Sequence, residues 1–357
     1  MYIDILSGRL FALRDTTGPV RLAGLRLPLG AVAPVADRPG TWIAAAGTGI
    51  ALLSADGSLE RLDRPEDRTP LPSRMNDGVT DPAGHFWAGS MAYDGTEGAG
   101  SLYRTDPDGT VVRVLDGLTI ANGPAFIADG TIMYLADTAE GTIFRCGVDP
   151  VSGGLSTGPD TFARLREDEG SPDGMTVDEE GCLWVAMSGA GAFRLYHPDG
   201  RLLHTLAVPA PHPTSVCLHP DDYGLLITTA RYGVKNPDEA FGAVLSVPYR
   251  SRERRRVPGG AEHGIRHYAE PAPASVNWLV SKRRLMWPPS SDQCRPESSA
   301  AARASPPAQT VMSSSWCSMV LRLATEAGLL TTEQLDTILR PENLTGRSPL
   351  PEVLTMP

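Results

Sequence analysis

The chain has 357 residues, enough to bury a large core, and its apolar content of 41% and charged content of 21% are ordinary for a globular protein. Its net charge of −10 argues against nucleic acid as the main partner, because neutralising phosphates requires a basic face. No apolar run reaches the roughly 18 residues needed to span a membrane, and no signal peptide is recognisable at the N-terminus. The five cysteines form no CxxC pair, so we expect free thiols and a cytoplasmic location.

The first 248 residues read as short strands separated by turns. The apolar or alternating runs are rich in Val, Ile, Leu and aromatic residues and are bounded by Gly, Pro or Asp. No segment there keeps a 3.6-residue apolar period over the length of a helix, so we expect an all-β fold. The expected strands are 2–6, 42–46, 50–53, 86–91, 102–104, 111–115, 132–137, 183–187, 193–196, 202–208 and 225–229.

The turns in this region recur. Asp-Gly pairs that begin at Asp56, Asp108, Asp129 and Asp199 each precede an apolar strand, as hairpin turns do. A longer phrase, Asp-x-x-Gly-x-x-Trp, occurs at 81–87 and at 178–184, an offset close to two units of about fifty residues. Units of this size with three or four strands are typical of propeller blades. A β-sandwich, the alternative, does not explain the repeated phrase.

Three polar segments with a glycine also lie about fifty residues apart. They are Arg-Met-Asn-Asp-Gly at 74–78, Ile-Ala-Asn-Gly-Pro at 120–124 and Ser-Pro-Asp-Gly-Met at 171–175. We interpret them as loops of a repeat fold that collect ligands at one point. Asn-Gly and Asp-Gly are also common hairpin turns, so plain turns are the alternative.

The character of the chain changes after residue 248. Residues 249–318 are rich in Ser, Pro, Ala and Arg, a composition typical of a disordered linker. Residues 319–357 read as a short helical tail, because Gly328 ends one apolar segment and Thr332 is placed to cap the next. We therefore expect a propeller over 1–248, followed by a linker and a tail.

Several phrases within residues 1–248, taken in their order and spacing, resemble the SMP-30/gluconolactonase/LRE (regucalcin-like) family. The phrases are those at 74–78, 86–91, 122–123, 172–175, 183–186 and 213–215. The resemblance implies a six-bladed β-propeller with one divalent metal on its central axis and an enzyme that opens sugar lactones.

The resemblance also assigns roles to residues. It places metal ligands at Asn122 and Asp173, and substrate-binding residues at Arg74, Asn76 and Asp94. Asn and Asp oxygens suit Ca²⁺, Mg²⁺, Mn²⁺ or a weakly held Zn²⁺. Such a cation polarises a carbonyl and lowers the pKa of a bound water, and Asp173 is then also the expected general base.

The chain departs from the family pattern at both ends. The third metal ligand of the family is a glutamate in a Gly-Glu-Gly/Ser-Pro-x-Trp phrase, and the chain opens on the strand after that phrase. Asp4 occupies the place of a structural residue, so we expect an incomplete first blade and impaired metal binding. Residues 327–345 weakly resemble the C-terminus of the fumarase/aspartase family. A truncated, frameshifted or fused reading frame is one interpretation of this tail, and a genuine interaction tail is the other.

These observations predict metal-dependent hydrolysis of a small sugar lactone, without nucleic acid or membrane partners. Two alternatives stay open. One is a catalytically impaired propeller that binds a sugar acid or Ca²⁺ without turnover, and the other is a scaffold that recruits a protein. The lactone, the metal and the oligomeric state are not determined by the residues.

Overall fold

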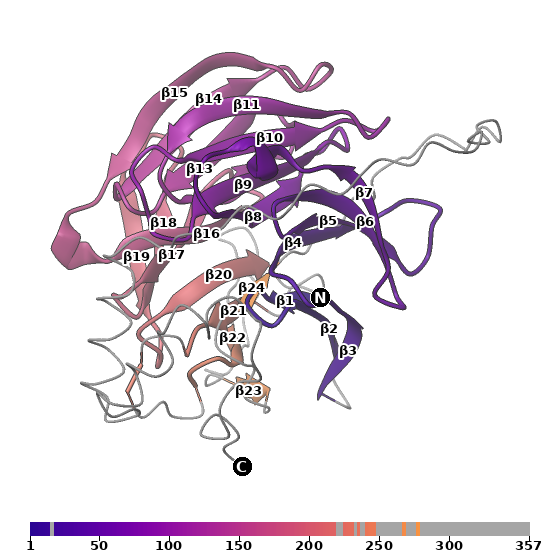
Figure 1. The fold of residues 1–357 in the computed structure, drawn as a ribbon. Helices are drawn as coiled ribbons and strands as arrows, with labels where there is room; N and C mark the ends of the chain where they lie inside the picture. Colours follow the sequence, from indigo (N-terminus) through magenta and orange to yellow (C-terminus); the bar gives the residue numbers. More distant parts are fainter. Residues whose placement is uncertain are drawn as a thin grey trace, which may run out of the picture. The chain divides into compact units, whose positions relative to one another are not determined.

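The computed structural model describes residues 1–14, 18–218, 224–231, 234–235 and 240–247, and the backbone of two short strands at 266–268 and 276–278. The chain divides into two compact units, Met1–Ser290 and Ser291–Pro357, and every described residue belongs to the first. This unit is built almost entirely of strands, which form six antiparallel sheets of four strands each (Figure 1). The expectation of an all-β fold is confirmed.

The first three blades contain the first eleven strands of the chain and the last described strand. Blade 1 is β24 (Val276–Trp278), β1 (Tyr2–Asp4), β2 (Arg9–Arg14) and β3 (Gly18–Gly24). Blade 2 is β4 (Leu29–Pro34), β5 (Thr41–Ala46), β6 (Gly49–Ser54) and β7 (Leu59–Asp63). Blade 3 is β8 (Ser73–Thr80), β9 (Phe86–Ala92), β10 (Gly100–Thr105) and β11 (Val111–Leu118).

The other three blades follow in chain order. Blade 4 is β12 (Ala121–Phe126), β13 (Ile132–Asp137), β14 (Thr142–Val148) and β15 (Leu155–Arg164). Blade 5 is β16 (Ser171–Val177), β17 (Leu183–Ser188), β18 (Ala192–Tyr196) and β19 (Leu202–Ala207). Blade 6 is β20 (Pro213–Leu218), β21 (Leu225–Thr229), β22 (Val244–Val247) and β23 (Arg266–Tyr268). Two 3₁₀ turns, η1 (Pro65–Arg68) and η2 (Glu167–Glu169), precede blades 3 and 5.

The strand named first in each blade above is its inner strand, and it lies next to the inner strand of the following blade. Contacts join β4 to β8, β8 to β12, β12 to β16, β16 to β20, β20 to β24 and β24 to β4. These six inner strands therefore close a ring, and the sheets form the blades of a six-bladed β-propeller. Among the described residues, no helical segment is long and apolar enough to cross a membrane.

Residues 1–24 supply three strands of blade 1 and β24 supplies the fourth, so this blade has four strands where an incomplete blade was expected. The chain begins on the second strand of that blade, and β24 pairs antiparallel with β1 in the inner position. Thus β23 and β24, which lie inside the predicted linker, continue the strand pairing beyond residue 248. The rest of the linker and the predicted helical tail lie outside the described residues.

The repeated Asp-x-x-Gly-x-x-Trp phrase is a structural device. Asp81, which follows β8, accepts hydrogen bonds from the backbone N–H groups of Gly84 and His85 and from the Trp87 indole at 3.0 Å. Asp178 accepts from backbone N–H groups at the equivalent place after β16. Trp87 and Trp184 are at most 1% exposed and pack between neighbouring blades. The phrase therefore ties each turn to the core.

The three polar segments are strands, which corrects their interpretation as loops. They lie in the inner strands β8, β12 and β16. In each strand the pairing register shifts within the polar segment, between Met75 and Gly78, between Asn122 and Ala125, and between Pro172 and Met175. Such a bulge bends a strand and redirects a side chain without ending the pairing. The inner strands β4 and β20 shift register near their starts as well.

Candidate active site at the inner strands

The bulges of three adjacent inner strands bring polar side chains together. We call this group the inner-strand cluster. It consists of Arg74, Asn76 and Asp77 from β8, Asn122 from β12 and Asp173 from β16. Close approach of the strands requires glycine, because a Cβ on Gly123 would lie 2.9 Å from the Asp173 carbonyl oxygen. Packing between blades therefore sets the geometry of the cluster.

A one-way chain of hydrogen bonds crosses the three blades. The Arg74 Nη1 donates to Asn76 Oδ1 at 2.7 Å, and Asn76 Nδ2 donates to Asn122 Oδ1 at 2.7 Å. Asn122 Nδ2 then donates to Thr138 Oγ1 at 2.8 Å, and Thr138 Oγ1 donates to the Pro172 carbonyl oxygen at 2.7 Å. Each group in this chain donates to the next one, so the side-chain amides of Asn76 and Asn122 each have one fixed orientation. The Asn122 Oδ1 atom is therefore held in place.

Two carboxylates stand next to this chain. Asp77 is 5% exposed and accepts from the N–H groups of Gly78 at 2.7 Å and Gly123 at 2.8 Å, so it also fastens blade 3 to blade 4. Burial raises the pKa of Asp77 to about 6, although the two hydrogen bonds act to lower it.

Asp173 carries the strongest electrostatic perturbation in the cluster. Burial of its carboxyl, together with repulsion from Asp77, raises its pKa well above the ordinary range, although part of the residue reaches solvent. One oxygen accepts from the N–H of Gly174 at 3.0 Å, and within the described part of the chain the other has no hydrogen-bond partner. A carboxylate with a raised pKa and an uncommitted oxygen is equipped to take a proton or to bind a cation.

Arg74 provides the positive charge. Burial lowers the pKa of its guanidinium, while the neighbouring Tyr93 and Asp173 act in the opposite direction. The guanidinium keeps its charge in proteins, so it can hold an oxyanion or a hydroxyl beside Asp173.

Four of the five predicted site residues meet in this cluster, and Asp94 does not. Asp94 lies in the exposed β9–β10 connection, where it accepts from the N–H and hydroxyl of Thr96 in a local turn. Its predicted role in substrate binding therefore lacks a contact with the cluster and stays a prediction. Sequence reasoning did not single out Asp77 or Thr138. Asp77 stands inside the Arg-Met-Asn-Asp-Gly phrase, and its position before glycine was the available signal.

The chemistry of the donors fits a hard divalent cation. Asn122 and Asp173 offer oxygen ligands, and two like charges in a poorly solvated site are stabilised by a cation between or beside them. In the described ranges there is no group of three or more His, Cys, Asp or Glu side chains that could hold a metal ion. Asp4 is buried and accepts hydrogen bonds from Ser7 in the β1–β2 turn, which agrees with its expected structural role.

Comparison with known proteins agrees with the family resemblance found in the sequence. The model of the family described as SMP-30/Gluconolactonase/LRE-like region matches residues 1–231. The chain is 36% identical over 179 residues to the putative sugar lactone lactonase YvrE of Bacillus subtilis, and the match covers 49% of this chain but only 60% of that relative. It is 35% identical over 237 residues to the pentonolactonase XacC of Haloferax volcanii, with 64% of this chain and 76% of the relative covered.

A solved structure agrees as well. The calcium-binding protein regucalcin of Agrobacterium tumefaciens superposes with a TM-score of 0.60 at 29% identity, over 65% of this chain and 78% of that one. None of these matches supports the resemblance of residues 327–345 to the fumarase/aspartase family, and those residues lie outside the described part of the chain.

Proposed function

This chain belongs to the SMP-30/gluconolactonase/LRE-like family, and we propose that its inner-strand cluster hydrolyses a sugar lactone. The observation that carries the proposal is the placement of Asp173. Its carboxyl has a raised pKa and an uncommitted oxygen, and it lies beside the Arg74 guanidinium. Hydrolysis of a lactone requires a base for water and positive charge for the developing oxyanion, and these two residues supply both.

Each residue of the cluster has a distinct part in the reaction. Asp173 accepts the proton of the attacking water, and its raised pKa makes it a stronger base than an ordinary aspartate. Arg74 hydrogen-bonds the substrate and stabilises the oxyanion. Asn76 donates both of its amide hydrogens within the protein, to the Ala121 carbonyl oxygen and to Asn122 Oδ1, so it meets the substrate by accepting from a sugar hydroxyl. The Asn76–Asn122–Thr138 chain holds the amides in one orientation, so little reorganisation accompanies the reaction.

Asn122 and Asp173 are the residues that would hold a divalent cation, whether Ca²⁺, Mg²⁺, Mn²⁺ or Zn²⁺. When bound there, the cation supplies Lewis-acid polarisation of the lactone carbonyl and a lower pKa for water. The comparisons give no support to the expectation that activity is impaired, which stays a prediction. A cytoplasmic location is part of the proposal and rests on the buried thiols of Cys146 and Cys217, which form no disulfide with the described residues.

The test is turnover of a panel of aldonolactones by the purified chain, with each of the four cations or with EDTA. Asp173→Asn should lower kcat/KM by roughly 10³-fold, because it removes the base. Asp129→Asn is the matched control, since it makes the same change in an exposed Asp-Gly turn and should leave kcat/KM unaltered. Calorimetric titration of the cation should show weaker binding to Asp173→Asn than to wild type.

Two outcomes would count against the proposal. A folded wild-type chain that binds a cation or a sugar acid without turnover would make this a binding protein. Equal activity of Asp173→Asn and wild type would remove Asp173 from the reaction.

A further inference from the structure

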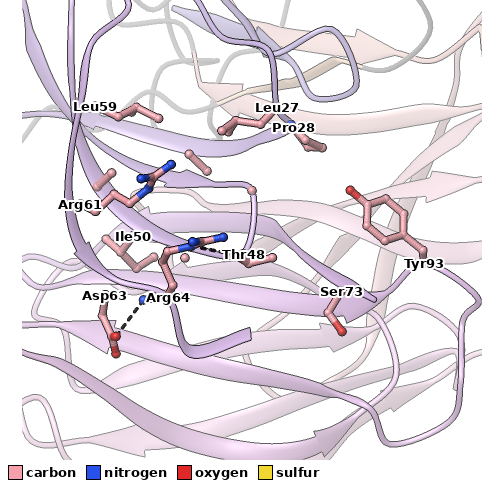
Figure 2. Close-up of a pocket in the computed structure, with 14 residues that line it drawn as sticks. Leu27, Pro28, Thr48, Ile50, Leu59, Arg61, Asp63, Arg64, Ser73 and Tyr93 are labelled. Carbon is pink, nitrogen blue, oxygen red and sulfur yellow. Dashed lines mark hydrogen bonds between the residues drawn. The ribbon is translucent and has the colours of Figure 1, made fainter. Parts of the chain in front are cut away.

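A second recess opens beside the inner-strand cluster. The cavity has a volume of about 280 Å³ and is lined by the β3–β4 connection, the β5–β6 hairpin, β7 with the adjoining Arg64, Ser73 and Tyr93 (Figure 2). This volume is near the lower end of the range for small-molecule sites. It is enough for one substituent of a sugar and its first water molecules.

The cavity and the cluster share a wall. Ser73 of the cavity directly precedes Arg74 of the cluster in β8. Tyr93 lines the cavity, its N–H donates to the Pro72 carbonyl oxygen at 3.0 Å, and its side chain acts on the pKa of Arg74. A ligand held by Arg74 therefore has the cavity within reach of its far end.

Positive charge dominates the side of the cavity opposite Tyr93. In Figure 2 the guanidinium groups of Arg61 and Arg64 extend toward the open space from the β7 side, and the Tyr93 hydroxyl is turned toward them. Arg64 is held by Asp67 at 2.9 Å and by Thr48 Oγ1 at 3.3 Å.

Asp63, the acidic side chain in the cavity wall, already has interaction partners. Asp63 pairs with Arg68 and also accepts from the backbone N–H of Arg64. Arg61, by contrast, makes no ion pair and no hydrogen bond with the described residues, and the same holds for the Tyr93 hydroxyl. Two uncommitted donors, one of them charged, thus face the same space.

The other lining groups strengthen an interaction with an anion. Leu27, Ile50 and Leu59 give the cavity apolar surface, which lowers the local dielectric constant relative to water. The Ser73 hydroxyl donates to the Leu71 carbonyl oxygen, and the Thr48 hydroxyl donates to the Asp67 carboxylate. A neutral hydroxymethyl group would therefore gain little here, whereas an oxyanion would gain the charge-assisted hydrogen bonds of Arg61.

We propose that this cavity is a specificity site for an anionic substituent of the sugar lactone, a phosphate, sulfonate or carboxylate group bound by Arg61 and Tyr93. The proposal rests on the proposed lactone hydrolysis and names the substrate class of that site. The guanidinium is suited to oxyanions because its planar N–H groups match two oxygens at once.

The test compares a neutral hexonolactone with its 6-phosphorylated, 6-sulfonated and 6-carboxylate counterparts. Wild type should show a KM roughly tenfold lower for at least one of the charged lactones than for the neutral one. Arg61→Gln should remove that preference by raising KM for the charged lactone alone, with kcat for both and KM for the neutral lactone unchanged. The preference should also decrease as salt is raised, because screening weakens exposed charge pairs.

Arg21→Gln is the matched control. Arg21 is an exposed arginine on β3, the outer strand of blade 1, as Arg61 is on β7, the outer strand of blade 2. This variant should retain the preference. The ranking of the three charged lactones identifies the oxyanion.

Binding of the open-chain acids by calorimetry separates this inference from lactone hydrolysis. The 6-phosphorylated aldonate should bind wild type more tightly than the aldonate with an unmodified 6-hydroxyl, and Arg61→Gln should equalise them, even if no lactone is turned over. Equal KM and equal affinity in wild type for ligands with and without a charged 6-substituent would overturn the inference. An Arg61→Gln variant that behaves like Arg21→Gln would overturn it as well.

Discussion

The same dipeptide, Asp-Gly, occurs in two regions of this propeller with opposite electrostatic results. At the hairpin turns of the outer surface, Asp56, Asp108, Asp129 and Asp199 each accept a hydrogen bond from the backbone N–H two residues ahead. These hydrogen bonds lower the pKa of each aspartate below its ordinary value. The turns keep their carboxylates charged and solvated.

At the inner strands the local hydrogen bond is similar, but the pKa of the aspartate is raised and not lowered. Asp77 and Asp173 also accept from the N–H of the following glycine. Their pKa values are nevertheless raised, first by burial and, for Asp173, by repulsion from Asp77. Desolvation outweighs the two hydrogen bonds of Asp77 and the one of Asp173 when these carboxylates are removed from water. Position in the fold, and not the dipeptide, therefore determines which aspartates carry chemistry.

The largest effect on stability should come from the titration of Asp77. Its pKa is raised to about 6 in the folded state, from an ordinary value of 3.8, so the folded protein holds a proton that the unfolded chain has lost between these values. The contribution of Asp77 to the free energy of unfolding should therefore be largest below pH 4, fall by up to about 3 kcal/mol toward pH 6, and level off above it. Urea unfolding of the metal-free protein across this range measures the slope.

The Asp77→Asn variant isolates this contribution. It should show a shallower decrease of unfolding free energy with pH, with the remainder due to Asp173. It should also be less stable at low pH, since the amide can accept from Gly78 or Gly123 with only one oxygen. An unchanged slope would show that Asp77 is not the group that titrates.

A smaller effect on stability is expected when a side chain is added where the inner strands pack closely. A Cβ on Gly174 would lie 2.4 Å from Ser215 Oγ and 2.7 Å from the Thr214 carbonyl oxygen, so Gly174→Ala must push β16 and β20 apart. We expect a loss of about 2 kcal/mol in the free energy of unfolding. Gly24, at the end of the outer strand β3, is the control, because a Cβ there meets no atom within 4 Å. Equal stability of the two alanine variants would contradict the tight packing of the inner strands.

The smallest effect should follow from changing an outer turn. Asp129→Asn removes an exposed charge whose hydrogen bonds to Thr131 an amide can partly replace. Its thermal midpoint should stay within about 2 °C of wild type, since surface substitutions of this kind cost little. Differential scanning calorimetry measures it. A large loss would show that the outer turns are coupled to the core in the way that Asp81 is.

Much of the fold could be predicted from local patterns. The expected strands at 132–137 and 225–229 coincide with β13 and β21, and the other nine differ only at their ends. Short-range signals suffice there because alternating burial and Asp-Gly turns are properties of neighbouring residues. The resemblance of phrases to a known family added Arg74, Asn76, Asn122 and Asp173, which the structure gathers in one cluster.

Only the tertiary structure decided what the polar segments are and what their aspartates do. Segments 74–78, 120–124 and 171–175 read as loops because their polar residues and glycines hide the strand period, yet each pairs as an inner strand with a bulge. Asp77 and Thr138 acquire their roles from contacts with residues 46 and 34 positions away in the chain. Sequence patterns alone predicted eleven of the middle and outer strands, because strands and turns are local, and they predicted none of the inner strands. The site, the pKa of Asp173 and the uncommitted charge of Arg61 depended on packing between blades, which sets burial and brings distant groups together.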